Sequence, residues 1–128
     1  MSVTLSDVFL PRQPDMNLKY AYAFEKFSDA ISSMATSRDP LPKRLSRVRV
    51  YAFAALAEGQ VPLSVRARFR AFCEAMASKD PECGDDGRIA ATVRSMSWHT
   101  ADRLANDLVE MFFDICRAYH ESDEDSYS

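Results

Sequence analysis

Glycine is scarce in this chain, with only three among 128 residues. So few glycines exclude a β-sandwich with many tight turns and a glycine-rich loop that cradles phosphate. No apolar run approaches the roughly 18–20 residues of a membrane-spanning helix. Residues 1–7 also lack the basic and apolar regions of a secretory signal. We therefore expect a protein of the cytoplasm with no membrane partner.

Cysteine is sparse as well, and the three residues, Cys73, Cys83 and Cys116, are widely spaced. An odd, dispersed set is unlike the dense and even framework of a small disulfide-bonded domain, and it favours a reducing compartment. The length suits one domain with a single core. We predict one helical domain over residues 1–120 and an acidic flexible tail over residues 121–128.

The first predicted helix begins at Asp15 or Asn17, either of which can serve as its N-cap, and runs to about Ser37. Its large apolar side chains recur at spacings of three and four residues, which places them on one face: Tyr20, Phe24, Phe27, Ile31 and Met34. Such a stripe predicts a core contact. A docking surface for another protein is the alternative.

A second helix is predicted over residues 43–58, with Pro42 in its first turn and Gly59 as a left-handed C-cap. Its second half is apolar nearly all round, which is typical of a central helix buried on several sides. Residues 46–53 also alternate with period two, as a half-buried strand does. Because the chain offers no partner strand, we prefer the helix.

The third predicted helix has Ser64 as its N-cap, and residues 80–87 resemble a loop. A fourth helix starts at Arg88, and a fifth is capped by Ser97 or Thr100. These segments and their short connections predict an all-α fold, a compact antiparallel bundle of four to five helices.

Charge is unevenly distributed along the chain. The formal net charge is −3, but residues 38–70 carry +6 and residues 71–128 carry −8. Seven of the eight cations in the basic block are arginine, whose planar fork suits phosphate and carboxylate. One hypothesis is therefore that this block contacts the backbone of RNA or DNA. The residues predicted to do so are Lys43, Arg44, Arg47, Arg66 and Arg70.

The alternative is that these arginines form ion pairs within the protein. The expected partners lie on the outer side of the last helix: Asp102, Asp107, Glu110 and Asp114. The acidic tail has three interpretations. It competes with nucleic acid for the basic residues, it mimics nucleic acid toward another protein, or it only aids solubility.

No pattern of catalytic or metal-binding residues is convincing. Cys116 and His120 lie one helical turn apart, a spacing that can hold zinc, but Cys73 and Cys83 would have to complete the site. Cys116 as a nucleophile lacks an orienting network in the sequence. The carboxylates on the last helix fit a solvated face better than acid–base chemistry. We predict no catalytic residue, no metal site, no cofactor and no enzymatic activity.

The sequence thus favours a small helical accessory subunit of a larger cytosolic assembly, such as a ribonucleoprotein, that contacts nucleic-acid backbone without reading sequence. The alternative is a protein-binding inhibitor or adaptor, of the immunity type or the phage-encoded anti-defence type, which acts through an acidic or apolar surface. A homo-oligomer is left open, because an apolar stripe serves a core and an interface equally well.

Overall fold

The computed structural model describes residues 14–81 and 87–125, with side chains for residues 19–81 and 87–120. Five α-helices and two short helical segments follow one another: α2 (Pro14–Thr36), α3 (Leu41–Arg47), the π-helical η1 (Val48–Ala52), the 3₁₀-helical η2 (Glu58–Gln60), α4 (Leu63–Met76), α5 (Arg88–Ser95) and α6 (Trp98–Asp125). No strand occurs within these described ranges. The predicted all-α bundle is confirmed.

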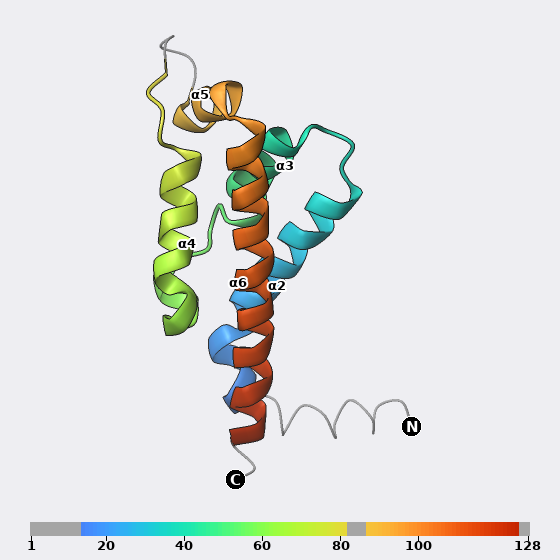
Figure 1. Ribbon diagram of the computed structural model, residues 1–128. Coiled ribbons are helices and arrows are strands. Elements are labelled where there is room, and N and C mark those ends of the chain that lie inside the picture. Colours follow the sequence, from blue (N-terminus) through green and yellow to red (C-terminus); the bar gives the residue numbers. More distant parts are fainter. Residues whose placement is uncertain (1–13, 82–86, 126–128) are drawn as a thin grey trace.

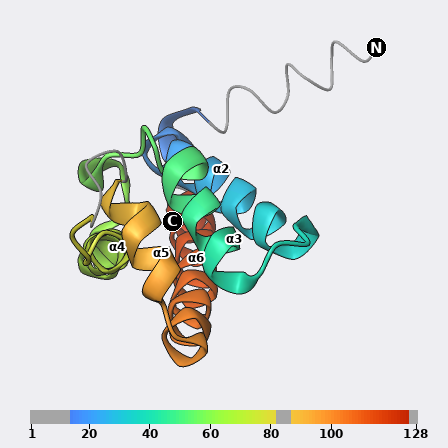
Figure 2. The ribbon, with the colours of Figure 1, turned by 90° about the horizontal axis from the view of Figure 1, so that it is seen from above.

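Helix α6 is the centre of the bundle. It runs antiparallel to α2 and α4, and it packs against α2, α3 and α4 (Figure 1). Seen along the bundle, α4 and α3 lie on opposite sides of α6, while α5 crosses the end where α6 begins (Figure 2). The prediction that the second helix is the central one is therefore wrong. The longest helix takes that place, because it packs against three of the other four helices.

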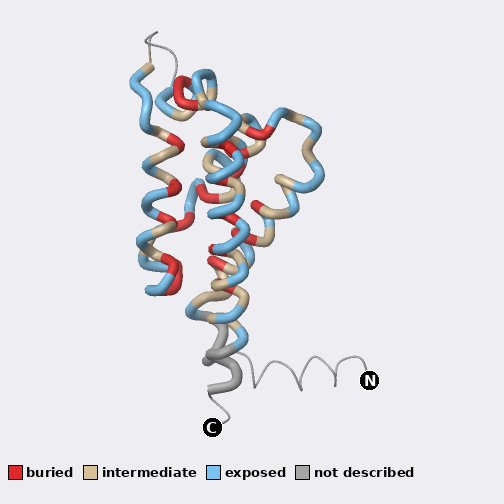
Figure 3. The backbone as a smooth tube through the Cα atoms, viewed as in Figure 1, coloured by how far each residue is buried: buried red, intermediate tan, exposed pale blue. Residues whose placement is uncertain are grey.

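The core lies along one face of α6, and buried residues recur along the inner face of each helix (Figure 3). A cluster of four phenylalanines joins α2, α4 and the end of η1. The Phe53 ring centroid lies 4.6 Å from that of Phe27, 5.2 Å from that of Phe69 and 5.9 Å from that of Phe72. All four side chains are almost fully buried. Separations of this size are favourable for aromatic pairs.

The predicted stripe on the first helix belongs to the core. Phe27 has no exposed surface, and Phe24 stacks on Tyr119 of α6 at 4.6 Å between ring centroids with the planes 2° apart. Ile31 and Met34 also pack against the core cluster. The stripe binds α2 to α6, so it is occupied within the chain and does not form a free docking face.

The second predicted helix is wrong in its second half. Helix α3 ends at Arg47, and the next turn is π-helical, with the Phe53 N–H donating to the Val48 carbonyl over 3.0 Å. The wider turn shifts the helical phase, so that Val50 and Tyr51 are 42% and 73% exposed. The period-two pattern of residues 46–53 falls on this segment, which is not a strand.

Several predicted helix ends also differ. Gly59 lies within η2, and no described glycine has a positive φ, so the left-handed C-cap is wrong. Helix α4 starts at Leu63 and contains Ser64, and α2 starts at Pro14 and contains Asp15 and Asn17, so these residues are not the N-caps. In both helices a proline stands at the start, where its lack of an N–H costs no hydrogen bond.

The start of the last helix is confirmed. The Ser97 hydroxyl accepts a hydrogen bond from the Thr100 N–H over 3.1 Å, which is the N-cap arrangement. At its other end α6 extends to Asp125, and so it includes the first residues of the predicted tail. The side chains from residue 121 onward lie outside the described part, and the domain boundary at residue 120 stays a prediction.

Thr92 is a buried hydroxyl that ties α5 to the segment after α4. Its Oγ1 is 2.8 Å from the Arg88 carbonyl, to which it donates, and accepts from the Lys79 N–H over 3.0 Å. The Thr92→Val substitution keeps the shape and removes the acceptor, so we expect the free energy of unfolding to fall by about 1 kcal/mol. We also expect faster hydrogen exchange at the Lys79 amide.

The control for this prediction is Thr36→Val at the exposed end of α2, where Thr36 Oγ1 donates to Ser32. We expect that change to leave chemical denaturation nearly unaltered. Unchanged exchange at Lys79 in the Thr92 variant would show that the hydroxyl does not hold this connection.

Candidate functional site

Two of the five predicted nucleic-acid contacts hold the backbone of the protein itself. Arg44 donates to the carbonyls of Asp39 and Met34 over 2.8 and 3.2 Å, which joins α3 to the end of α2. Arg66 donates to the Val61 carbonyl from Nε and Nη2 over 3.2 and 2.9 Å. Both side chains thereby satisfy carbonyls near helix ends, a use that the sequence did not reveal.

Two others form ion pairs with nearby carboxylates. Arg47 Nε lies 3.0 Å from Asp39 Oδ2, and Arg70 makes two hydrogen bonds of 2.7 and 3.0 Å to the Glu58 carboxylate. The hydrogen bond from Arg70 lowers the pKa of Glu58 and the same bond raises the pKa of Arg70. Both pairs are solvent-exposed, so each adds little to stability.

Lys43, the fifth predicted contact, is exposed, and its side chain forms no hydrogen bond or ion pair within the described residues. It lies with Arg44 and Arg47 on α3, whereas Arg66 and Arg70 lie on α4. These helices are on opposite sides of α6 (Figure 2). The five residues are thus not gathered on one face of the bundle, and their role as a nucleic-acid contact stays a prediction.

The internal pairing expected with the last helix occurs at one carboxylate. Asp114 accepts from Arg68 of α4 over 2.7 Å and from Arg117 over 2.6 Å, and these bonds lower its pKa. In the part of the chain that the structure describes, the other expected partners form no ion pair: Asp102, Asp107 and Glu110. Two other arginines of the basic block pair instead with its own acidic residues, Arg47 with Asp39 and Arg70 with Glu58.

The cysteines are poorly placed for nucleophilic chemistry. Burial raises the pKa of both the Cys73 and Cys116 thiols, which reduces the thiolate fraction at neutral pH. Cys83 lies outside the described residues. Among the residues with described side chains, no group of three or more histidine, cysteine and acidic residues is arranged to hold a metal ion.

A largely apolar groove lies between the α3–η1 segment and α5. It has a volume of about 590 Å³. Nine residues line it: Lys43, Ser46, Val50, Gly87, Arg88, Ile89, Ala90, Val93 and Arg94. We call this concavity the α3–α5 groove. Its size is that of a ligand or peptide site.

The α3–α5 groove combines apolar side chains with positive charge. Val50, Ile89 and Val93 supply the apolar surface, and three of the nine lining residues are basic while none is acidic. Arg88 is paired with Asp80 over 2.9 Å, but both side chains are mostly exposed and the pair is weak. The groove therefore suits an occupant with an apolar face and negative charge.

Sequence reasoning did not find this groove. The period of Ile89 and Val93 indicated only that α5 is amphipathic. Val50 was expected on a buried helix, and the π-helical turn exposes it. Only the packing of α3 against α5 brings the two apolar surfaces together.

Comparison with known protein families, with curated proteins and with solved structures found no match to this chain. Across the described residues, no helix combines the length and the apolar character that crossing a bilayer requires.

Proposed function

We propose that this protein is a non-enzymatic protein-interaction module, an adaptor or an inhibitor, that binds an acidic amphipathic helix of a partner protein in the α3–α5 groove. The observation that carries the proposal is the groove itself, an apolar surface whose described lining residues include three basic ones and none that is acidic. A partner helix buries its apolar face on Val50, Ile89 and Val93, and its acidic residues face the basic side chains.

The state of the arginines supports a protein partner over nucleic acid. Four of the five side chains predicted to contact phosphate already donate to carbonyls or carboxylates of the chain. Each would have to give up such a contact before it could bind a phosphate. A partner helix can bind the apolar surface of the groove without breaking any such hydrogen bond, because the burial of apolar surface is itself favourable.

Contact with nucleic-acid backbone is the second candidate function. It is favoured by the charge of +6 over residues 38–70 and by the exposed position of Lys43. Binding of this kind would not depend on the nucleotide sequence, and its affinity would fall steeply as the salt concentration rises. The Arg47→Glu and Arg70→Glu double variant should abolish that binding if these side chains carry it.

The test is affinity capture from the native cells after nuclease treatment, with the wild type and two alanine-to-glutamate variants. Ala90→Glu puts a negative charge in the α3–α5 groove, in the first turn of α5 where an acidic residue is compatible with the helix dipole. We expect the wild type to retain a protein partner and the variant to lose at least about tenfold in affinity for it.

The matched control is Ala67→Glu, an equally exposed alanine on α4 that does not line the groove. It should capture the same partner as the wild type. The proposal is wrong if Ala90→Glu retains the partner as well as Ala67→Glu does. Loss of every partner on nuclease treatment would instead support the nucleic-acid candidate.

A further inference from the structure

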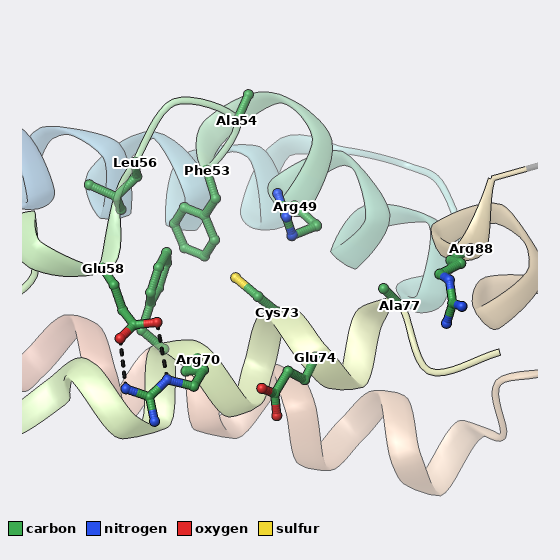
Figure 4. Close-up of a pocket in the computed structure, with 11 residues that line it drawn as sticks. Arg49, Phe53, Ala54, Leu56, Glu58, Arg70, Cys73, Glu74, Ala77 and Arg88 are labelled. Atoms are coloured by element: carbon green, nitrogen blue, oxygen red, sulfur yellow. Dashed lines mark hydrogen bonds and ion pairs between the residues drawn. The ribbon is translucent and has the colours of Figure 1, made fainter. Parts of the chain in front are cut away.

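A second concavity lies between η1 and α4, on another side of α3–η1 from the α3–α5 groove. It is an open pocket with a volume of about 590 Å³. The nearly buried side chains of Phe53, Leu56 and Phe69 form its apolar floor. Arg49 and Cys73 border it (Figure 4). We call it the Arg49 pocket. Its volume is in the range of sites for small molecules.

Arg49 carries a buried polar atom without a partner in this pocket. Its Nε is buried and makes no hydrogen bond, and within the described residues the side chain forms no ion pair. A buried guanidinium N–H without an acceptor loses hydration and gains nothing in return. Native proteins rarely tolerate such a group unless it has a role or an additional partner.

The backbone at Arg49 is also unusual. Arg49 is the second residue of the π-helical segment η1, whose Val48 carbonyl accepts from the Phe53 N–H. Single π-helical turns are uncommon and occur frequently at functional sites. This turn places Arg49 and Phe53 on the same side, so that the guanidinium and an aromatic ring border one pocket (Figure 4).

The other charges around the pocket are balanced or directed elsewhere. Arg70 is engaged by both oxygens of Glu58, and Arg88 is paired with Asp80. The Glu74 carboxylate points away from Arg49 (Figure 4). Arg49 is therefore the cation of this pocket that forms no ion pair within the described residues. It complements a single negative charge better than the double charge of a phosphate monoester.

We propose that the Arg49 pocket binds a small amphiphilic monocarboxylate, whose carboxylate accepts hydrogen bonds from the Arg49 guanidinium and whose apolar body rests on Phe53, Leu56 and Phe69. This ligand site shares only Arg88 with the α3–α5 groove, and it does not depend on the proposed function. Charge-assisted hydrogen bonds from a partly desolvated guanidinium are stronger than hydrogen bonds between neutral groups. They therefore favour a carboxylate over a neutral ligand.

The test compares two probes of nearly the same shape, 1-naphthylacetate and its neutral amide, by isothermal titration calorimetry on the full chain. We expect the carboxylate to bind about tenfold more tightly than the amide, because only it pairs with Arg49. In Arg49→Met, which keeps an apolar stem, this preference should disappear. In the control Arg88→Met, at the edge of the pocket and already paired in the wild type, the preference should remain.

A measurement on the wild type keeps the test independent of how well the variants fold. The Cys73 sulfur points toward the space between Phe53 and Arg49 (Figure 4), whereas Cys116 lies on α6 outside the pocket. We expect 1-naphthylacetate to slow alkylation of Cys73 by N-ethylmaleimide and to leave Cys116 unaffected. The proposal fails if neither probe binds at millimolar concentration, if the amide binds equally well, or if Cys73 is not protected.

Discussion

Replacing Phe53 with alanine is expected to lower the free energy of unfolding by about 3–5 kcal/mol. Phe53 is 2% exposed, and its ring contacts those of Phe27, Phe69 and Phe72. The residue follows the π-helical turn and is the point at which α2, α4 and η1 meet. Truncation of Phe53 leaves a cavity in the core. The three surrounding rings cannot easily move into it, because packing within α2 and α4 holds each of them in place.

Chemical denaturation of the variant measures this loss, with Phe113→Ala as the control. Phe113 is 59% exposed on α6, so its truncation should change stability by no more than about 0.5 kcal/mol. Equal effects of the two substitutions would contradict the position of Phe53 in the core. A domain of this size has about 5–15 kcal/mol to lose, so the Phe53 variant should be markedly less stable yet measurable.

Replacing Leu108 with alanine is expected to cost about 2–5 kcal/mol. Leu108 has no exposed surface and belongs to α6, the helix that packs against α2, α3 and α4. The apolar pattern of the sequence gave the central position to the second helix instead. The predicted and the observed central helix can be distinguished at Val50. The sequence pattern predicted that Val50 is buried, whereas it is 42% exposed in the structure.

The matched measurement is therefore Leu108→Ala against Val50→Ala, both by chemical denaturation. We expect the Val50 variant to remain within about 0.5 kcal/mol of the wild type. If Val50→Ala lowers the free energy of unfolding strongly and Leu108→Ala lowers it only slightly, the second predicted helix is the central one. Val50 would then be buried and could not line the α3–α5 groove.

The helices themselves were predictable, because large apolar residues at helical spacing fix which face is buried. The stripe that contains Phe24 and Phe27 predicted the α2 contact, and the Ser97 cap marked the break before α6. The π-helical turn was not predictable. A π-helical turn contains one more residue than an α-helical turn, and no residue type in the sequence marks that insertion. The pattern of residues 46–53 was compatible with both a helix and a strand.

The candidate sites were less predictable than the fold. Asp39 and Glu58 are the only acidic residues in the basic block, and their pairing with Arg47 and Arg70 could have been anticipated from that. The carbonyl contacts of Arg44 and Arg66 depend on how the chain turns at helix ends, which residue type alone does not specify. The α3–α5 groove and the Arg49 pocket arise only when distant elements pack together.

Site-specific photo-crosslinking tests most directly whether an acidic amphipathic helix occupies the α3–α5 groove. A benzoylphenylalanine placed at position 90 lies in the groove, and one at position 67 lies on α4 outside it. After irradiation of nuclease-treated native cell extract, we predict a discrete protein adduct from position 90 whose linked peptide is acidic and amphipathic, and none from position 67. The same adducts from both positions, or none from position 90, would contradict the proposal that the α3–α5 groove binds a helix of a partner protein.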